Sequence, residues 1–158
     1  MLSVEYRDVT CTIDGVYSFL LTALVELKKE AWSNMQKALI SIDYTYDFVA
    51  DDGKLTAGKP AQAISDAIYE ATKCAFDRGD YIFFAIDAHD PEDNFHPETK
   101  LFPPHNIIGT SGRDLFGPLN NFYQQHKDDS HVFWMDKRHY SSFSGTDLDI
   151  RLRERGVN

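Results

Sequence analysis

Residues 84–110 concentrate side chains that can bind a metal ion. Asp87 and His89 flank a single residue where an apolar run ends, and in an extended chain both side chains point the same way, as a chelating pair. Glu98 and His105 follow in the next loop. Carboxylates and imidazoles without a thiolate suit zinc, manganese or iron, with water completing the coordination shell. The sequence therefore predicts one divalent metal ion, zinc first, held by these four residues.

The other histidines are less easily assigned. His96 lies inside the same loop, and it could be a metal ligand, a hydrogen-bond partner of a ligand or a surface residue. His126 and His131 border the polar turn QQHKDDSH, so we expect both to be solvated. His139 follows a charged strand end, where the surface is its expected place and a role in the site is the alternative.

Three apolar runs each end in a charged side chain. The runs KALISID, YIFFAID and HVFWMDK have the length and composition of buried strands, and they end in Asp43, Asp87 and Lys137. Between the first two runs, residues 60–79 carry apolar residues at helical spacing, with Pro60 placed to start the helix and Gly79 to stop it. The predicted apolar face of this helix consists of Ile64, Ala67, Ile68, Ala71, Cys74 and Ala75.

A strand, a helix and a second strand in this order form a crossover unit that builds parallel sheets. We therefore predict the α/β class, with a doubly wound, mostly parallel sheet that has helices on both faces. Ligands of such folds bind beyond the carboxyl ends of the strands. Asp43, Asp87 and Lys137 should consequently converge on one edge of the sheet.

Composition limits the choice of partners. With 158 residues, a formal net charge of -9 and a pI near 5.0, the chain lacks the basic surface of a nucleic-acid-binding protein. The longest apolar run, residues 15–27, is too short to span a membrane and no basic segment precedes it. The cysteines, Cys11 and Cys74, form neither a disulfide framework nor a zinc-finger spacing. A soluble protein of the reducing cytoplasm, with no nucleic-acid or membrane partner, is the expected class.

The two ends of the chain depart from this pattern. Residues 1–34 are interpreted as a doubtful N-terminal extension, because the segment from Met35 reads as a natural start; a genuine helix at 15–31 is the alternative. Residues 146–156 predict a helix with Thr146 as its cap and Gly156 at its end. An alternating fold should continue into a further central strand, so residues 35–158 are expected to be a C-terminally truncated domain.

Four motifs occur in a specific order along the chain. They are the aspartate that ends KALISID, the D-x-H pair, the proline-flanked histidine followed by GT, and the lysine of HVFWMDK. In this combination, from Met35 to Asn158, the chain resembles the isochorismatase-like cysteine hydrolases and, within them, the bacterial nicotinamidases. The resemblance implies a doubly wound α/β fold and hydrolysis of nicotinamide, pyrazinamide or another small amide to an acid and ammonia. Homo-oligomers are common in this family, so self-association is possible.

The resemblance also assigns roles to residues. It places the catalytic aspartate at Asp43 and the catalytic lysine at Lys137: the aspartate takes the proton of a thiol nucleophile and later returns it to ammonia, while the lysine favours the thiolate. The implied metal ligands are Asp87, His89, Glu98 and His105. In other members a histidine coordinates in place of the carboxylate, and His96 is the nearest candidate for that role in this chain. The candidates for the walls of an aromatic slot around the substrate ring are Phe48, Phe102, Trp134 and Tyr140, and core packing is the alternative for each.

The nucleophilic cysteine of the family follows the helix that contains RERGV, beyond residue 158. Cys74 is expected to be a core residue of the first helix and Cys11 belongs to the doubtful extension. The sequence thus predicts a nicotinamidase chain that lacks its nucleophile and is inactive as it stands. Two alternatives remain: a non-catalytic remnant that binds metal or ligand, and a hydrolase of another small amide that uses metal-bound hydroxide and needs no cysteine.

Overall fold

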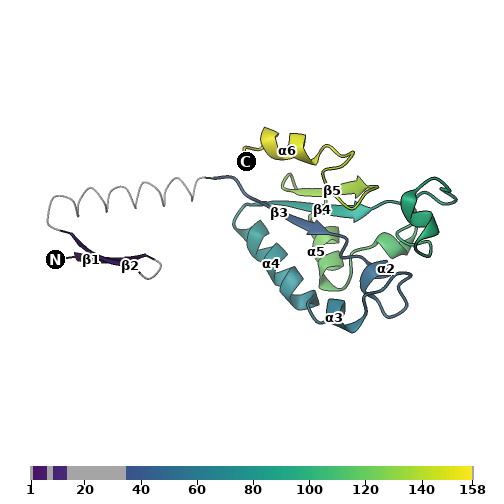
Figure 1. The fold of residues 1–158 in the computed structure, drawn as a ribbon, viewed down its shortest axis with the longest axis horizontal. Helices are drawn as coiled ribbons and strands as arrows, with labels where there is room; N and C mark the ends of the chain where they lie inside the picture. The colour runs from purple at the N-terminus through teal and green to yellow at the C-terminus, as the bar shows by residue number, and fades with distance from the viewer. Residues whose placement is uncertain (1, 7–8, 14–34, 158) are drawn as a thin grey trace. The chain divides into compact units, whose positions relative to one another are not determined.

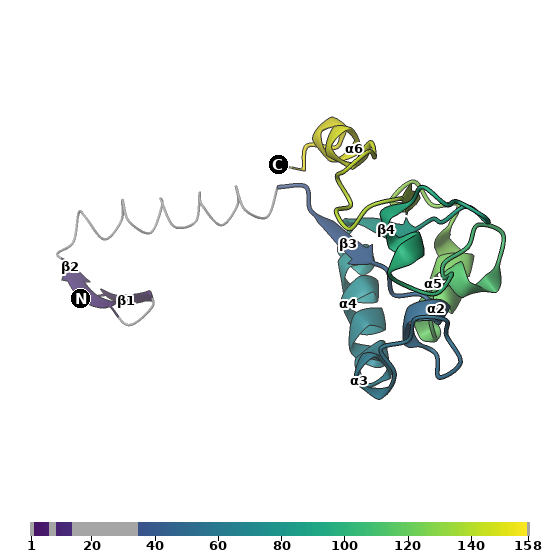
Figure 2. The same cartoon turned by 45° about the vertical axis from the view of Figure 1, so that its right-hand side comes forward.

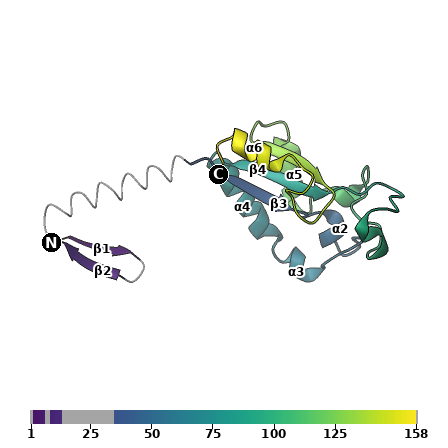
Figure 3. The same ribbon diagram turned by 45° about the horizontal axis from the view of Figure 1, so that its top comes forward.

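The structure is a computed structural model that describes residues 2–6, 9–13 and 35–157 (Figure 1). It divides into two units, Met1–Met35 and Gln36–Asn158. In the first unit, β1 (Leu2–Tyr6) pairs antiparallel with β2 (Val9–Ile13), as Figure 3 shows. The alternative of a helix at 15–31 lies outside the described residues. Among the described helices, none has the length and apolar character that crossing a membrane requires.

The second unit contains the predicted parallel sheet. β3 (Ala38–Ile42), β4 (Tyr81–Asp87) and β5 (Val132–Lys137) lie in the order β3-β4-β5, and both pairs are parallel. The register pairs Asp87 with Lys137 at the carboxyl end. The prediction of three parallel strands that bring charged residues to one edge is therefore confirmed, with Asp43 directly after the end of β3.

Helices cover both faces of this sheet (Figures 1 and 2). On one face, α4 (Ser65–Asp77) and α5 (Pro118–His126) pack over a core that includes Ile82, Phe84 and Val132. On the other face, α6 (Leu148–Glu154) places Leu148 against Phe83 and Met135. The short elements are α2 (Tyr46–Val49), α3 (Lys59–Gln62) and two 3-10 helices, η1 (Pro97–Lys100) and η2 (Ser111–Arg113). The strand alternation thus supplies one apolar surface to each helical layer.

The predicted helix at 60–79 is interrupted and rotated. α3 starts at Lys59 with Pro60 in its first turn, but this helix ends before α4 begins. Ile64 is the N-cap residue of α4 and is 49% exposed. Ala75 is buried as predicted. Thr72, which was not part of the predicted face, is also buried, and its hydroxyl donates to the carbonyl of Ile68 at 2.9 Å. The prediction of the apolar face was therefore partly wrong.

Cys74 is the clearest error in that prediction. Its side chain is exposed rather than part of the core, and its Sγ accepts a hydrogen bond from Arg78 Nη1 at 3.1 Å. The end of α4 does follow the prediction, since Gly79 adopts a φ of +83° that favours glycine.

The last helix ends as expected and starts one residue later than expected. Asp147 occupies the N-cap position of α6, while Thr146 Oγ1 accepts the backbone N–H of Leu148 at 3.4 Å. At the other end, Gly156 has a φ of +69°, and the backbone N–H of Val157 donates to the carbonyl of Leu152 at 3.0 Å. This arrangement is a Schellman motif, the common C-terminal cap.

Candidate active site and metal centre

The carboxyl edge of the sheet holds a buried cation between two carboxylates. Lys137, the last residue of β5, is 1% exposed, and its Nζ lies 2.6 Å from Oδ2 of Asp43. The same Nζ contacts Oδ1 of Asp87, the last residue of β4. The backbone N–H of Asp87 donates to Oδ1 of Asp43 at 2.9 Å. The geometric prediction that Lys137 and Asp43 form a salt bridge is confirmed.

Asp43 has a backbone conformation that is rare outside glycine. Its φ is +56°, directly after the last residue of β3. Its N–H still donates to the carbonyl of Ala85 at 3.1 Å, and the N–H of Thr45 then donates to the Asp43 carbonyl at 2.9 Å. The chain therefore leaves the sheet in a tight turn at Asp43, and such left-handed conformations are frequent at functional sites.

The three charged groups have different proton affinities. Burial, followed by the charge of Asp87, raises the pKa of Asp43 despite the nearby ammonium. Burial alone would also raise the pKa of Asp87, but the neighbouring His89 imidazole and the Lys137 ammonium outweigh it and lower that pKa. Burial would lower the pKa of Lys137, yet hydrogen bonds to both carboxylates raise it. Asp43 is thus the carboxylate that accepts a proton more readily.

The four predicted metal ligands lie together, and one of them, Asp87, is also the carboxylate that contacts Lys137. Asp87, His89, Glu98 and His105 are buried, and each offers one ligand atom within 4.8 Å of all the others. Nε2 of His105 lies 3.5 Å from Oε2 of Glu98, and Nε2 of His89 lies 3.9 Å from Oδ2 of Asp87. Two ligands come from the end of β4, one from η1 and one from the following loop.

The imidazoles of this group have the hydrogen bonding of metal ligands. Nδ1 of His105 lies 2.8 Å from the carbonyl of Pro103, so it must carry the proton and leaves a lone pair on Nε2. Nε2 of His105 and Nε2 of His89 are buried without a hydrogen-bond partner among the described residues. Buried polar atoms of this kind are costly unless a ligand satisfies them. The donor set therefore fits a divalent cation.

His96 lies next to this group but uses both of its nitrogens elsewhere. Its Nδ1 accepts the backbone N–H of Glu98 at 3.3 Å, and its Nε2 lies 2.6 Å from the carbonyl of Arg138. The Nε2 atom must therefore carry the proton, and the ring has no free lone pair. Because His96 is also buried, the structure places it as a support for Glu98 and not at the surface.

The remaining histidines are not fully solvated. His139 stacks on His96 at a centroid distance of 6.3 Å. His126 packs on Phe122 at 4.6 Å and is half-buried. His131 stacks on Tyr81 at 4.9 Å but its side chain stays 40% exposed, so the expectation that both are solvated holds only in part. Tyr81 lies far from His131 in the sequence, and Phe122 lies one turn before His126 in α5, so the polar turn QQHKDDSH reveals neither contact.

Two of the four aromatic candidates lie at the site. Phe48 and Phe102 have ring centroids 5.2 Å and 6.3 Å from that of His105. Phe102 also lines a cavity of about 340 Å³, together with Glu98 and His105. Trp134 and Lys137 lie three residues apart in β5, so their side chains point to opposite faces of the sheet. Trp134 packs on Tyr123 of α5 at 5.0 Å, in the core beneath α4 and α5. Tyr140 is 72% exposed.

Other residues of the site were missed by the sequence analysis. Nε of Arg113 donates to the carbonyl of Asp87 at 2.8 Å and thereby holds the end of β4. Asp47 and Asn106 are buried and hydrogen-bonded to each other across the loop. An acid in DYTYDF and a basic residue in TSGRDL were the available signals, but neither pattern names a partner.

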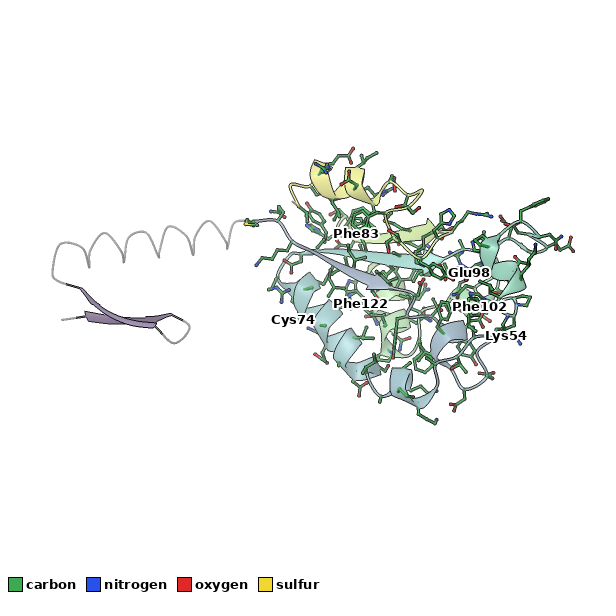
Figure 4. All side chains as sticks on the ribbon, viewed as in Figure 1. Lys54, Cys74, Phe83, Glu98, Phe102 and Phe122 are labelled. Atoms are coloured by element: carbon green, nitrogen blue, oxygen red, sulfur yellow. The ribbon has the colours of Figure 1, made fainter. Side chains whose placement is uncertain are left out.

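Cys74 lies far from this centre. Figure 4 shows it near the end of α4 away from Glu98 and Phe102, which lie together near the carboxyl ends of the strands. Among the described side chains, Cys74 is the free thiol, and it is exposed on α4.

Comparison with known proteins gives this arrangement a family. Residues 37–158 match the isochorismatase domain. The chain belongs to the isochorismatase family. Its parallel sheet and its helices therefore belong to a known architecture.

Three relatives of this isochorismatase-family chain are similar over the same region. The crystal structure of pyrazinamidase/nicotinamidase from Streptococcus mutans UA159 is 79% identical, with a TM-score of 0.76, over 77% of this chain and 67% of that chain. The nicotinamidase/pyrazinamidase PncA from Bacillus subtilis is 54% identical, with a TM-score of 0.76, over 78% and 67%. An isochorismatase family protein PncA of Bacillus subtilis (strain 168), described as uncharacterized, is 55% identical over 123 residues, 78% of this chain and 67% of its own.

A more distant structure shares the fold. The pyrazinamidase of Pyrococcus horikoshii in complex with zinc is 23% identical, with a TM-score of 0.56, over 77% of this chain and 65% of that chain. At this identity the likeness supports the architecture alone.

Proposed function

We propose that this isochorismatase-family protein is a nicotinamidase, which hydrolyses nicotinamide, and the related amide pyrazinamide, to an acid and ammonia. The observation that carries the proposal is the buried ammonium of Lys137 between Asp43 and Asp87, next to four converging metal ligands. The relatives that are 54% and 79% identical are nicotinamidases/pyrazinamidases, which supports this choice of substrate.

Asp43 is proposed as the general acid and base. Its raised pKa suits a group that takes a proton from a thiol and returns it to the departing ammonia. In this scheme the thiol sulfur bonds to the amide carbon, the carbon–nitrogen bond breaks as Asp43 protonates the nitrogen, and water then cleaves the thioester. The Lys137 ammonium stabilises the negative charge that develops on sulfur.

The thiol of this scheme is not Cys74, which lies near the end of α4 that points away from Glu98 and Phe102. The family resemblance places the nucleophile on a strand-to-helix turn that follows α6. We therefore propose that residues 1–158 contain the general base, the lysine and the metal ligands but not the nucleophilic cysteine.

Asp87, His89, Glu98 and His105 are proposed to hold one divalent ion, zinc foremost, because nitrogen and oxygen donors without a thiolate suit it. An ion held by these residues would supply Lewis-acid chemistry next to the substrate. Phe48 and Phe102 flank His105 and provide apolar surface for the substrate ring.

A chimera tests the proposal. Residues 35–158 are joined to the part of the Streptococcus mutans relative that follows the matched region, and ammonia release from nicotinamide is measured with zinc or manganese present. We expect turnover by the chimera and none by the 158-residue chain. Asp43→Asn in the chimera should lower kcat by about 100-fold or more, the contribution typical of a general base.

The same assay separates the alternatives. A folded chimera that binds zinc but releases no ammonia would favour a non-catalytic binding protein. Turnover by residues 1–158 that survives Cys74→Ser and Cys11→Ser would instead show a hydrolase that needs no cysteine.

A further inference from the structure

Asp47 is a buried carboxylate directly behind the metal centre. It lies in the first turn of α2 and is 5% exposed. Its Oδ2 accepts the backbone N–H of Asn106 at 2.8 Å, and its Oδ1 accepts the backbone N–H of Lys54 at 3.2 Å. Both oxygens are therefore engaged by donors, and each of these bonds is charge-assisted.

Asn106 connects the two histidine ligands. It follows His105 in the chain, and its carbonyl accepts the backbone N–H of His89 at 3.1 Å. Its φ of +45° lies in the left-handed region, which asparagine adopts more readily than most residues other than glycine. The orientation of both imidazoles thus depends on how the Asn106 backbone is held.

Two contacts hold Asn106 from the segment that also carries Asp43. One is the Asp47 carboxylate, and the other is the hydroxyl of Thr45, which donates to Oδ1 of Asn106 at 3.0 Å. The position of Asp47 is itself fixed from behind, because a Cβ at Gly112 would lie 2.1 Å from its Oδ2. The carboxylate is thus confined between the backbones of Asn106 and Gly112.

We propose that Asp47 is a positioning residue of the metal centre, which fixes the Asn106 backbone so that His89 and His105 face the same divalent cation. The inference rests on the proposed metal site and deepens it. An asparagine at position 47 would keep the shape but would turn an NH2 group toward one of two N–H donors. The backbone of Asn106 or of Lys54 would then lose its acceptor and move.

The test measures zinc affinity of the purified 158-residue protein by competition with a chromophoric chelator. The visible absorption of the cobalt-loaded protein is recorded as well, because it reports the geometry around the ion. Asp47→Asn should weaken zinc binding by about 10- to 100-fold, the range typical of residues that orient metal ligands, and should change the cobalt spectrum. A merely structural role would leave the spectrum of the folded fraction unchanged.

Further variants keep the test decisive. Gly112→Ala leaves the carboxylate intact but displaces it, so it should weaken zinc binding in the same way. Thr45→Val removes the second contact to Asn106 and should cause a smaller loss, which can be measured if Asp47→Asn does not fold. Asp51→Asn is the matched control, since it removes an exposed carboxylate that pairs with Lys59. It should bind zinc as the parent does.

Two outcomes overturn the inference. If Asp47→Asn and Gly112→Ala keep the parental zinc affinity and cobalt spectrum, Asp47 supports only the fold, whatever happens to the melting temperature. If the parent binds zinc no better than the double variant His89→Ala, His105→Ala, the metal site itself is wrong. Failure of the nicotinamidase assay alone, with zinc affinity still dependent on Asp47, would reject the proposed substrate and leave this inference standing.

Discussion

Lys137 is the residue on which the site depends most directly. Its ammonium contacts Asp43 and Asp87, and all three side chains are largely removed from water. Two carboxylates this close repel each other unless a cation lies between them. The lysine therefore stabilises the fold and, in the proposed reaction, the thiolate by the same charge.

Removing that charge should destabilise the metal-free protein. Lys137→Met leaves two neighbouring carboxylates without their cation, and breaking a buried pair of this kind costs about 3–5 kcal/mol. Urea unfolding at pH 7 measures the loss. Lys59→Met, which breaks the exposed pair with Asp51, should cost less than about 1 kcal/mol.

The loss should also depend on pH. Burial and the charge of Asp87 already raise the pKa of Asp43 above its unfolded value, so in Lys137→Met this carboxyl takes up a proton first. A raised carboxyl pKa favours the folded state at low pH, and this contribution disappears as the pH rises through the folded pKa. The difference between the parent and Lys137→Met should shrink as the pH falls from 7 toward 5. A difference that stays constant over this range would contradict the argument.

Metal removal acts on a second set of residues. A ligand that binds only the folded state stabilises it by about 2.7 kcal/mol at a concentration 100 times its dissociation constant. Zinc should therefore raise the unfolding free energy of the parent by about this amount, and excess chelator should reverse the effect. The double variant His89→Ala, His105→Ala should show no zinc-dependent gain, and metal analysis of both proteins checks this. Equal metal content in the two proteins would contradict the assignment.

At the scale of elements, strands were more predictable than helix faces. Each strand of the sheet is an apolar run that ends in a charge, a signal contained within seven residues. The buried face of α4 depends on how the helix is rotated against α5, which local periodicity does not determine. Ile64 and Cys74 share the helical spacing of Ile68 and Ala75 but lie toward solvent.

In the candidate site, too, some residues could be predicted from the sequence and others could not. The metal ligands carry recognisable chemistry within one loop, so their types and spacing predict the cluster. The support given by Asp47, Asn106 and Arg113 runs through backbone N–H and carbonyl groups. Backbone groups are the same at every position, so no residue pattern could reveal which one a buried side chain contacts.

The rotation of α4 can be tested by matched substitutions. Cys74→Ser should change the unfolding free energy by less than about 0.5 kcal/mol, as expected for an exposed position. Ala75→Leu places a large side chain in the packed interior and should cost about 1–3 kcal/mol. Urea unfolding of the two variants compares the faces directly. A larger loss for Cys74→Ser than for Ala75→Leu would restore the face predicted from the sequence.

At the scale of the whole molecule, both outer strands of the parallel sheet, β3 and β5, pair only with β4 within the described residues. There β4 is the single strand neighbour of β3, so the other side of β3 presents unpaired backbone groups. Ile42 at the end of β3 is 52% exposed. Unpaired edges with apolar side chains favour pairing with another chain.

This edge leads to a prediction about assembly of the 158-residue chain. We expect it to form species larger than its 18.1 kDa monomer in light scattering coupled to size exclusion, increasingly so at higher concentration. Ile42→Lys places a charge at the edge and should shift the distribution toward the monomer, because a buried ammonium would be left without a partner in the paired state. Asp51→Asn serves as the control, since it alters charge in an exposed loop. An unchanged distribution in Ile42→Lys, with the circular dichroism of the parent retained, would show that the contact lies elsewhere on the molecule.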